Sequence, residues 1–200
     1  MEHDELSRRW FLACLTAGAG ASLLTAGHTS ISLANDRQLA VTPHCADDEP
    51  TPVQTAGPYF LPKSPKRRNL RDHGKGIPFV FSGTVVSRSC RPVASVLVEL
   101  WHADERGKYD LEGYRFRGHQ FTNAKGYFRF DTILPGLYPG RTRHFHVKYQ
   151  ALHKPVLTTQ HYFPGEPENN VDGIFNPVLL LRVSRRPVYA GSFVTVLDLA

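Results

Sequence analysis

Apolar and polar residues alternate with a period of two along most of the chain after residue 78. This period places alternate side chains on opposite faces of a strand. Turns rich in Pro, Gly, Asn and Asp separate the runs, and no long stretch has helical spacing. The pattern therefore predicts an all-β fold with the strands arranged as a sandwich. The expected strands cover residues 79–87, 96–101, 127–130, 144–149, 156–163, 178–183 and 188–198.

The segment before the first strand has a different composition. Residues 35–78 hold several prolines and the basic run Pro65-Lys66-Arg67-Arg68-Asn69-Leu70-Arg71, and they show no strand pattern. We expect this segment to wrap the sandwich irregularly, with residues 79–200 forming the core domain.

Residues 1–34 have the composition of an export signal. Ser7-Arg8-Arg9-Trp10-Phe11-Leu12 is a twin-arginine pattern, an Ala-, Gly- and Leu-rich run follows to Ala26, and Ser32-Leu33-Ala34 is a candidate cleavage site. The apolar run is too short and too rich in glycine for a membrane span of about 20 residues. We expect a removable signal, a periplasmic or secreted protein, and no stable membrane span after signal removal. The alternative is an uncleaved N-terminal anchor.

The chain is basic, with a formal net charge of +6. Loss of residues 1–34 removes two arginines and three acidic residues, so the charge rises to +7. Much of the excess lies in the basic run, which is either a cationic patch for acidic aromatic molecules and anionic polymers or a solvated loop. No nucleic-acid-binding motif accompanies it, so we expect no nucleic-acid partner.

The cysteine pattern agrees with an oxidising compartment. Cys14 would be lost with the signal, which leaves Cys45 and Cys90 as an even pair. We expect one disulfide between them, tying the N-terminal segment to the turn after the first core strand. Two free buried thiols are the alternative.

Two histidines share one face of the strand that begins at His144. His144 and His146 point the same way, roughly 7 Å apart along the strand, while Phe145 faces the core. Tyr138 lies in the turn just before them, and Tyr109 ends a turn after a strongly apolar strand. Two phenolates with two imidazoles suit a hard trivalent ion better than zinc, which makes Fe(III) the natural candidate. A solvated strand face that happens to hold histidines is the simpler alternative.

Six short motifs follow one another between Thr51 and about Phe175. They are Gln54-Thr55-Ala56-Gly57-Pro58-Tyr59-Phe60; Val98-Glu99-Leu100-Trp101-His102-Ala103-Asp104 with Gly107-Lys108-Tyr109; Gly126-Tyr127-Phe128-Arg129-Phe130; Pro135-Gly136-Leu137-Tyr138-Pro139; Arg141 with His144-Phe145-His146; and Thr159-Gln160-His161-Tyr162-Phe163. In these motifs the chain resembles the intradiol ring-cleavage dioxygenases, which include catechol and protocatechuate 3,4-dioxygenases. These are non-haem ferric enzymes that open catechols between the two hydroxyls.

The resemblance implies a mixed β-sandwich, an Fe(III) cofactor, and a catechol and O2 as partners, with a muconate-type product. The positions that match the iron ligands are Tyr109, Tyr138, His144 and His146. The positions that match the substrate pocket are Pro58, Tyr59 and Gln160. Arg141 matches the residue that stabilises negative charge on the substrate ring, and Tyr138 matches the ligand that leaves when substrate binds.

Two departures from the family bear on the substrate. The link from Pro139 to Arg143 is shorter than in the better-known soluble members, and Arg143 adds a second positive charge beside His144. Both favour a larger or anionic catechol. The identity of the catechol, its pathway and the subunit arrangement stay open, and an oligomer is compatible with the sequence.

Two other functions fit the same residues. The first is an exported β-sandwich binding module whose metal site is vestigial or structural. The second is a copper or zinc protein that uses the two histidines without the tyrosines. Loss of metal or colour on replacing either tyrosine would distinguish the ferric enzyme from both.

Overall fold

A computed structural model of the chain describes residues 49–71 and 75–200. The twin-arginine pattern, the candidate cleavage site, Cys14 and Cys45 lie outside the described residues, so export and the Cys45–Cys90 disulfide stay predictions. Within these two described ranges, no helix is long and apolar enough to cross a membrane.

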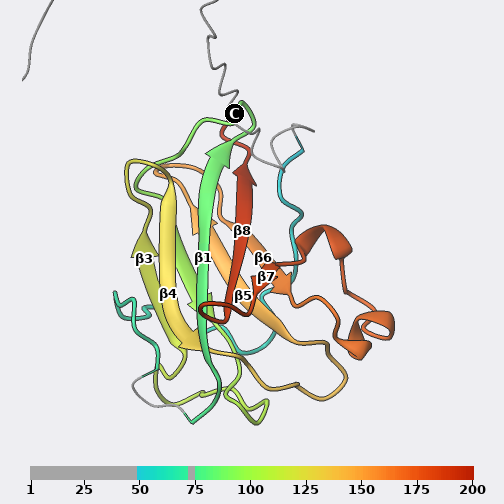
Figure 1. Cartoon of the computed structure of the whole chain (residues 1–200). Coiled ribbons are helices and arrows are strands. Elements are labelled where there is room, and N and C mark those ends of the chain that lie inside the picture. The colour runs from blue at the N-terminus through green and yellow to red at the C-terminus, as the bar shows by residue number, and fades with distance from the viewer. Residues whose placement is uncertain (1–48, 72–74) are drawn as a thin grey trace, which may run out of the picture. The chain divides into compact units, whose positions relative to one another are not determined.

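The described residues form two four-stranded sheets that make up a sandwich (Figure 1). The elements are β1 (Pro78–Ser87), β2 (Leu97–Trp101), β3 (Arg117–Phe121), β4 (Tyr127–Ile133), β5 (His144–Gln150), β6 (Leu157–Tyr162), η1 (Pro167–Asn170), η2 (Pro177–Leu179), β7 (Arg182–Ser184) and β8 (Ala190–Leu197), where η marks a 3₁₀ helix. The strand orders are β4-β1-β8-β7 and β3-β2-β5-β6. β1 and β8 run parallel and the other strand pairs antiparallel. The predicted all-β, mixed sandwich is therefore confirmed.

Aromatic side chains from the facing sides of both sheets form the core. Phe79 and Phe81 of β1 contact Phe145 of β5, with ring centroids 5.8 and 5.2 Å apart. Phe145, Val147 and Tyr149 are fully buried. Since alternate residues of a strand face opposite ways, the remaining face of β5, with the two histidines, is the outer face of its sheet.

The strand predicted over residues 178–183 is wrong in its first half. Residues Pro177–Leu179 form η2, and β7 begins only at Arg182. Pro177 fixes a helical backbone at the first position, and the side chain of Asn176 accepts a hydrogen bond from the Val178 N–H. These two local effects outweigh the β-preference of the apolar residues that follow.

The strand β3 was not predicted because its sequence, Arg-Gly-His-Gln-Phe, holds one apolar side chain. β3 lies at the edge of its sheet, where it pairs with β2. On its other side, the His119 N–H donates to the Pro65 carbonyl at 3.0 Å, and the His119 carbonyl accepts from the Arg67 N–H at 3.1 Å. Backbone pairing on both sides therefore forms this strand without an apolar face.

Residues 49–71, called the N-terminal segment below, bind both sheets through their backbone. The Thr51 N–H donates to β8 at 3.0 Å, the Gln54 N–H to β6 at 2.8 Å, and the Leu70 N–H to β4 at 2.8 Å. Arg67 and Arg68 of the basic run also serve this docking, since their side chains bind the Arg117 carbonyl at 3.0 Å and Asp131 at 2.7 Å. The irregular N-terminal wrap is thus fixed by specific contacts (Figure 1).

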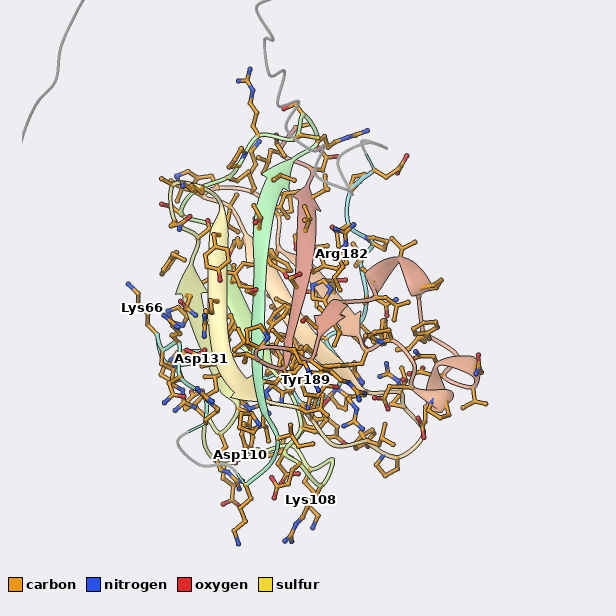
Figure 2. The ribbon with its side chains drawn as sticks, viewed as in Figure 1. Lys66, Lys108, Asp110, Asp131, Arg182 and Tyr189 are labelled. Atoms are coloured by element: carbon orange, nitrogen blue, oxygen red, sulfur yellow. The ribbon has the colours of Figure 1, made fainter. Side chains whose placement is uncertain are left out.

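Asp131 on β4 fastens this segment, and Figure 2 shows it on the side of the molecule that carries Lys66. Its carboxylate accepts hydrogen bonds from Arg68 at 2.7 Å and from Arg129 at 2.7 and 3.0 Å. Burial alone would raise the pKa of the Asp131 carboxyl, but the hydrogen bonds from Arg129 and Arg68 hold that pKa below its usual value.

We predict that Asp131→Asn lowers the free energy of unfolding by about 1 kcal/mol at pH 7, because it removes an anion from two partly solvated guanidinium groups. A depressed pKa stabilises the fold above the unfolded value of about 4 and loses this effect as the pH falls through the folded value. Urea unfolding of both proteins from pH 7 to pH 3 should therefore show a difference that shrinks below pH 4.

Asp198→Asn is the matched control for this prediction. Asp198 pairs with Arg88 at 3.7 Å, and both side chains are about half exposed, at 48 and 51 %. We expect this variant to unfold as the wild type does. Equal losses in the two variants would mean that Asp131 has no special role in fastening the N-terminal segment.

Candidate metal centre

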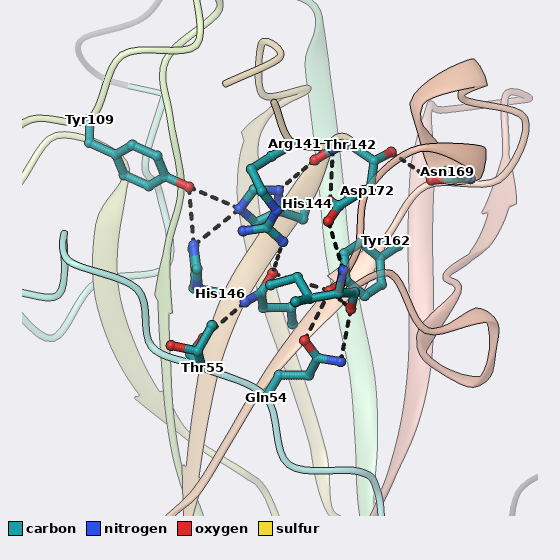
Figure 3. Close-up of polar contacts among 12 residues, drawn as sticks. Gln54, Thr55, Tyr109, Arg141, Thr142, His144, His146, Tyr162, Asn169 and Asp172 are labelled. Carbon is teal, nitrogen blue, oxygen red and sulfur yellow. Dashed lines mark hydrogen bonds and ion pairs between the residues drawn. The ribbon is translucent and has the colours of Figure 1, made fainter. Parts of the chain in front are cut away.

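Three side-chain atoms meet on the outer face of β5 (Figure 3). The Oη atom of Tyr109 lies 3.2 Å from Nε2 of His144 and 3.1 Å from Nε2 of His146, and the two Nε2 atoms are 3.1 Å apart. Both histidines are buried. The structure therefore brings together three of the four residues for which the sequence predicts a ligand role.

Both imidazoles are neutral at pH 7. Burial lowers the pKa of His144 to about 4 against the opposing effect of the Thr142 carbonyl, and burial followed by the charge of His144 lowers the pKa of His146. Nδ1 of His144 lies 2.6 Å from the Thr142 carbonyl, to which it donates its proton. Nε2 of His144 therefore presents a lone pair to the other two atoms.

These three atoms fit around a single metal ion. Donors about 2.1 Å from one ion, at angles between tetrahedral and octahedral, are about 3.0 to 3.4 Å apart. The three observed separations, 3.1 to 3.2 Å, lie in that range. A cation at the centre could be bound by the phenol oxygen and both Nε2 atoms at once, whereas the hydrogen bonds among these three atoms depend on the tautomer of His146. Two imidazoles and one phenol oxygen form a suitable set for a transition metal.

Tyr138, the fourth predicted ligand, lies in the same group of rings with its hydroxyl paired elsewhere. Its Oη atom is 2.6 Å from Oη of Tyr59. Tyr59 stacks on Tyr109 with ring centroids 4.6 Å apart, and Tyr138 meets Tyr109 edge to face at 5.9 Å. Tyr59, a predicted pocket residue, therefore lies against both Tyr109 and Tyr138.

The Tyr109 phenol is held in its neutral form by its surroundings. Burial raises the pKa of the Tyr109 phenol, and the positive charges of Arg141 and Arg117 oppose this rise without cancelling it. A bound cation at the three-atom cluster would supply the positive charge that favours the phenolate.

The two loops that carry the tyrosines pack directly on each other. Tyr109 belongs to the loop between β2 and β3, and Tyr138 to the loop between β4 and β5. Gly107 has a φ of +80°, and a Cβ atom there would lie 2.0 Å from the Leu137 carbonyl oxygen. The Gly136 N–H also donates to the Asp104 carbonyl at 2.7 Å. Only glycine permits this close approach of the two backbones.

Arg141 and Gln160 lie side by side, as predicted for residues of one pocket. Nη2 of Arg141 donates to Oε1 of Gln160 at 2.7 Å, and Nε2 of Gln160 donates to the Thr55 carbonyl at 2.9 Å. Gln160 is paired with His146 in the β5–β6 register and is fully buried. This link connects Arg141 to the N-terminal segment.

Pro58 and Arg143 contribute less to the cluster than their sequence positions suggested. Pro58 is exposed in a turn next to Tyr59. Arg143 is not an unpaired charge, because its Nε donates to Glu166 at 2.8 Å and its Nη1 donates to the Pro135 carbonyl. The second positive charge expected beside His144 is therefore present, but it is paired with Glu166.

Three residues around the cluster were not predicted. Trp101 stacks on His146 with ring centroids 5.0 Å apart and an interplanar angle of 8°. The guanidinium of buried Arg117 donates twice to the Asp110 carbonyl, at 3.1 and 2.7 Å, and so holds the backbone next to Tyr109. Asp172 accepts from Nε of Arg141 at 2.9 Å. The alternation of β2 could have placed Trp101 on the outer face of the sheet. No pattern in the sequence near Asp172 or Arg117 indicates their contacts.

Comparison with known proteins gives a consistent result. A family model described as "Dioxygenase" matches residues 55–184. The protocatechuate 3,4-dioxygenase beta chain of Burkholderia cepacia is 33% identical over 118 residues, which is 50% of each chain. Hydroxyquinol 1,2-dioxygenase of Corynebacterium glutamicum is 26% identical over 156 residues, 65% of this chain and 52% of that protein. The chain thus spans about half the length of these curated relatives.

Solved structures share the fold. The dioxygenase domain of a dioxygenase carbohydrate-binding protein fusion from Streptomyces sp. SirexAA-E is 55% identical, with a TM-score of 0.73 over 76% of this chain and 100% of that chain. 3-Chlorocatechol 1,2-dioxygenase from Rhodococcus opacus 1CP is 29% identical, with a TM-score of 0.68 over 74% of this chain and 72% of that chain.

We predict that Gly107→Ala separates the two tyrosine loops and lowers the free energy of unfolding by several kcal/mol. Its methyl group would meet the Leu137 backbone, which cannot move without displacing Tyr138. Urea or thermal unfolding measures the effect. Gly165→Ala is the matched control, since Gly165 has a φ of +77° and no atom within 4 Å of the added Cβ. It should lose only about 1 kcal/mol from the backbone conformation. Similar losses in both variants would contradict the packing argument.

Proposed function

The chain belongs to the intradiol ring-cleavage dioxygenase family, and from this membership we propose that it cleaves a catechol between its two hydroxyl carbons with O2. Both oxygen atoms enter the ring-opened, muconate-type dicarboxylic product. The observation that supports this activity most directly is the cluster of Tyr109, His144 and His146 around one point.

We propose that Fe(III) is the cofactor and that Tyr109, Tyr138, His144 and His146 hold it. When bound, Fe(III) would lower the pKa of both catechol hydroxyls and activate the ring toward O2. The donor set supports this choice, because phenolate oxygens favour a hard trivalent ion and neutral imidazoles are common ligands of iron.

The protein residues have separate tasks in this proposal. Tyr109, stacked on Tyr59, would be the fixed holder of the iron, and Tyr138 would be the replaceable one, able to hold a substrate proton at its Oη atom. Oη of Tyr59, 2.6 Å from that atom, is the partner for the released phenol. Arg141 supplies a fixed positive charge where negative charge develops on the ring.

Burial supports the same assignment. Trp101, His144 and His146 are nearly inaccessible to solvent, which keeps water from the reacting atoms and strengthens the field of Arg141. We assign recognition of the catechol oxygens or of an anionic ring substituent to Arg141, which lies beside Gln160 and has its Nε held by Asp172. The substrate is a catechol whose substituent the first assay should identify.

We predict that the iron-loaded protein has a visible phenolate-to-iron absorption band and consumes O2 with at least one of catechol, protocatechuate, hydroxyquinol and 3-chlorocatechol. Mass spectrometry should find a product with the mass of substrate plus one O2. Tyr109→Phe should lose the band and more than roughly 100-fold of the activity. Replacing a residue that only contacts a metal ligand already costs roughly 10- to 100-fold in metal affinity or activity, and Tyr109 is proposed to be a ligand itself.

Tyr114→Phe is the matched control in the same loop. The Tyr114 hydroxyl donates to the Pro62 carbonyl on the surface, at 3.0 Å. It should keep both colour and turnover. A colourless protein that binds zinc or copper equally well with and without the Tyr109 hydroxyl would rule out the ferric enzyme, and so would an iron-loaded protein that oxidises no catechol.

We also propose that the protein is exported by the twin-arginine route, on the strength of Arg8 and Arg9 before the apolar run. The double variant Arg8→Lys, Arg9→Lys should stay in the cytoplasm of the producing cell, while the wild type reaches the periplasm or medium in a shortened form. Cell fractionation with N-terminal sequencing measures this. Equal distribution of the two proteins would argue against the proposed route.

A further inference from the structure

Asp172 lies between η1 and η2, at least 26 positions along the chain from the predicted ligands, yet its side chain contacts Arg141 and the Thr142 N–H beside the cluster (Figure 3). The carboxylate is only 2 % exposed. One of its oxygens, Oδ2, accepts hydrogen bonds from Nε of Arg141 and from the Thr142 N–H, both at 2.9 Å. The other oxygen accepts from the Ile174 N–H at 3.1 Å. Asp172 is therefore itself held in one orientation.

The backbone of Thr142 links Asp172 to the ring of His144 through two successive peptide groups. Its N–H binds Asp172, and its carbonyl accepts the Nδ1 proton of His144 at 2.6 Å. Thr142 is fully buried, and its hydroxyl donates to Oδ1 of Asn169 at 2.5 Å. The Thr142 carbonyl holds the His144 ring through Nδ1, and Asp172 holds the N–H of the same residue.

We infer that Asp172 is a positioning residue that sets both the guanidinium of Arg141 and the ring of His144, an inference that rests on the proposed function. A charge-assisted hydrogen bond from a buried carboxylate is short and directional, so it can hold a guanidinium in one plane. Partners of this kind, one contact away from a metal ligand, commonly orient the ligand.

A neighbouring ion pair supplies the comparison. Like Arg141 and Asp172, Arg143 and Glu166 join the connection between β4 and β5 to the connection between β6 and β7, at 2.8 Å, and their side chains are 18 and 19 % exposed. Within the described residues, Glu166 binds Arg143 and makes no contact with Arg141 or the Thr142 peptide. If ion pairs between these loops act only by stabilising the fold, both pairs should have the same effect on the site.

The experiment compares Asp172→Asn, Glu166→Gln, Arg141→Lys and the Asp172→Asn, Arg141→Lys double variant. We expect Asp172→Asn to lose roughly 10- to 100-fold of its turnover per bound iron and to release iron faster to a chelator, and Glu166→Gln to keep wild-type values in both. Because Asp172 acts partly through Arg141, the combined loss in the double variant should be smaller than the product of the two single losses.

The outcomes separate this inference from the function on which it rests. A wild-type protein that oxidises no catechol contradicts the proposed function and the inference with it. Two results with an active wild type contradict the inference alone. In the first, the turnover losses of Asp172→Asn and Arg141→Lys multiply in the double variant. In the second, Glu166→Gln loses as much turnover and iron as Asp172→Asn. If thermal unfolding shows that Asp172→Asn does not fold, Asp172→Glu replaces it in the same comparison with Arg141→Lys. This variant keeps the negative charge but displaces the carboxylate oxygens.

Discussion

The strand β5 is buried on both faces, and this double burial determines where a site can form. Phe145 and Val147 face the aromatic core, which fixes the strand and its register. His144 and His146, on the other face, are covered as well. Burying two imidazoles is costly unless their nitrogens find partners. The covering loops supply partners for three of the four ring nitrogens, with the Thr142 carbonyl for Nδ1 of His144 and the Tyr109 hydroxyl between the two Nε2 atoms.

The cluster therefore depends on how the covering loops are fastened to one another. Gln160 ties the N-terminal segment to Arg141, and the close approach at Gly107 locks the two tyrosine loops together. Asp172 brings the loop between η1 and η2 against the residues before β5. Each fastening joins segments far apart in sequence, so the site forms only when the whole sandwich has folded. The site residues are thus positioned by contacts between loops, with few helices or strands around them.

The parts of this architecture that were predictable are those that a short stretch of sequence encodes. Two-residue alternation in β5 placed the histidines on one face, and the motif resemblance gave Tyr109 and Tyr138. β3 was missed because backbone pairing, not an apolar face, forms it. Asp172 could not be found, since nothing near it in the sequence indicates that it meets Arg141. The pairing of Arg143 with Glu166 was not foreseen for the same reason, since Glu166 belongs to another loop.

The two tyrosines differ in how they are held, and this difference bears on their roles in the proposed reaction. Tyr109 is fixed by Arg117 on the next carbonyl and by the ring of Tyr59 on its face, and its hydroxyl points at both histidines. The Tyr138 hydroxyl already has a partner outside the histidine pair, on Tyr59. Moving Tyr109 would break its contacts with Tyr59 and the two histidines, whereas the Tyr138 hydroxyl has a partner that is independent of the histidines. In the proposed reaction this difference would suit Tyr109 to the fixed ligand position and Tyr138 to the replaceable one.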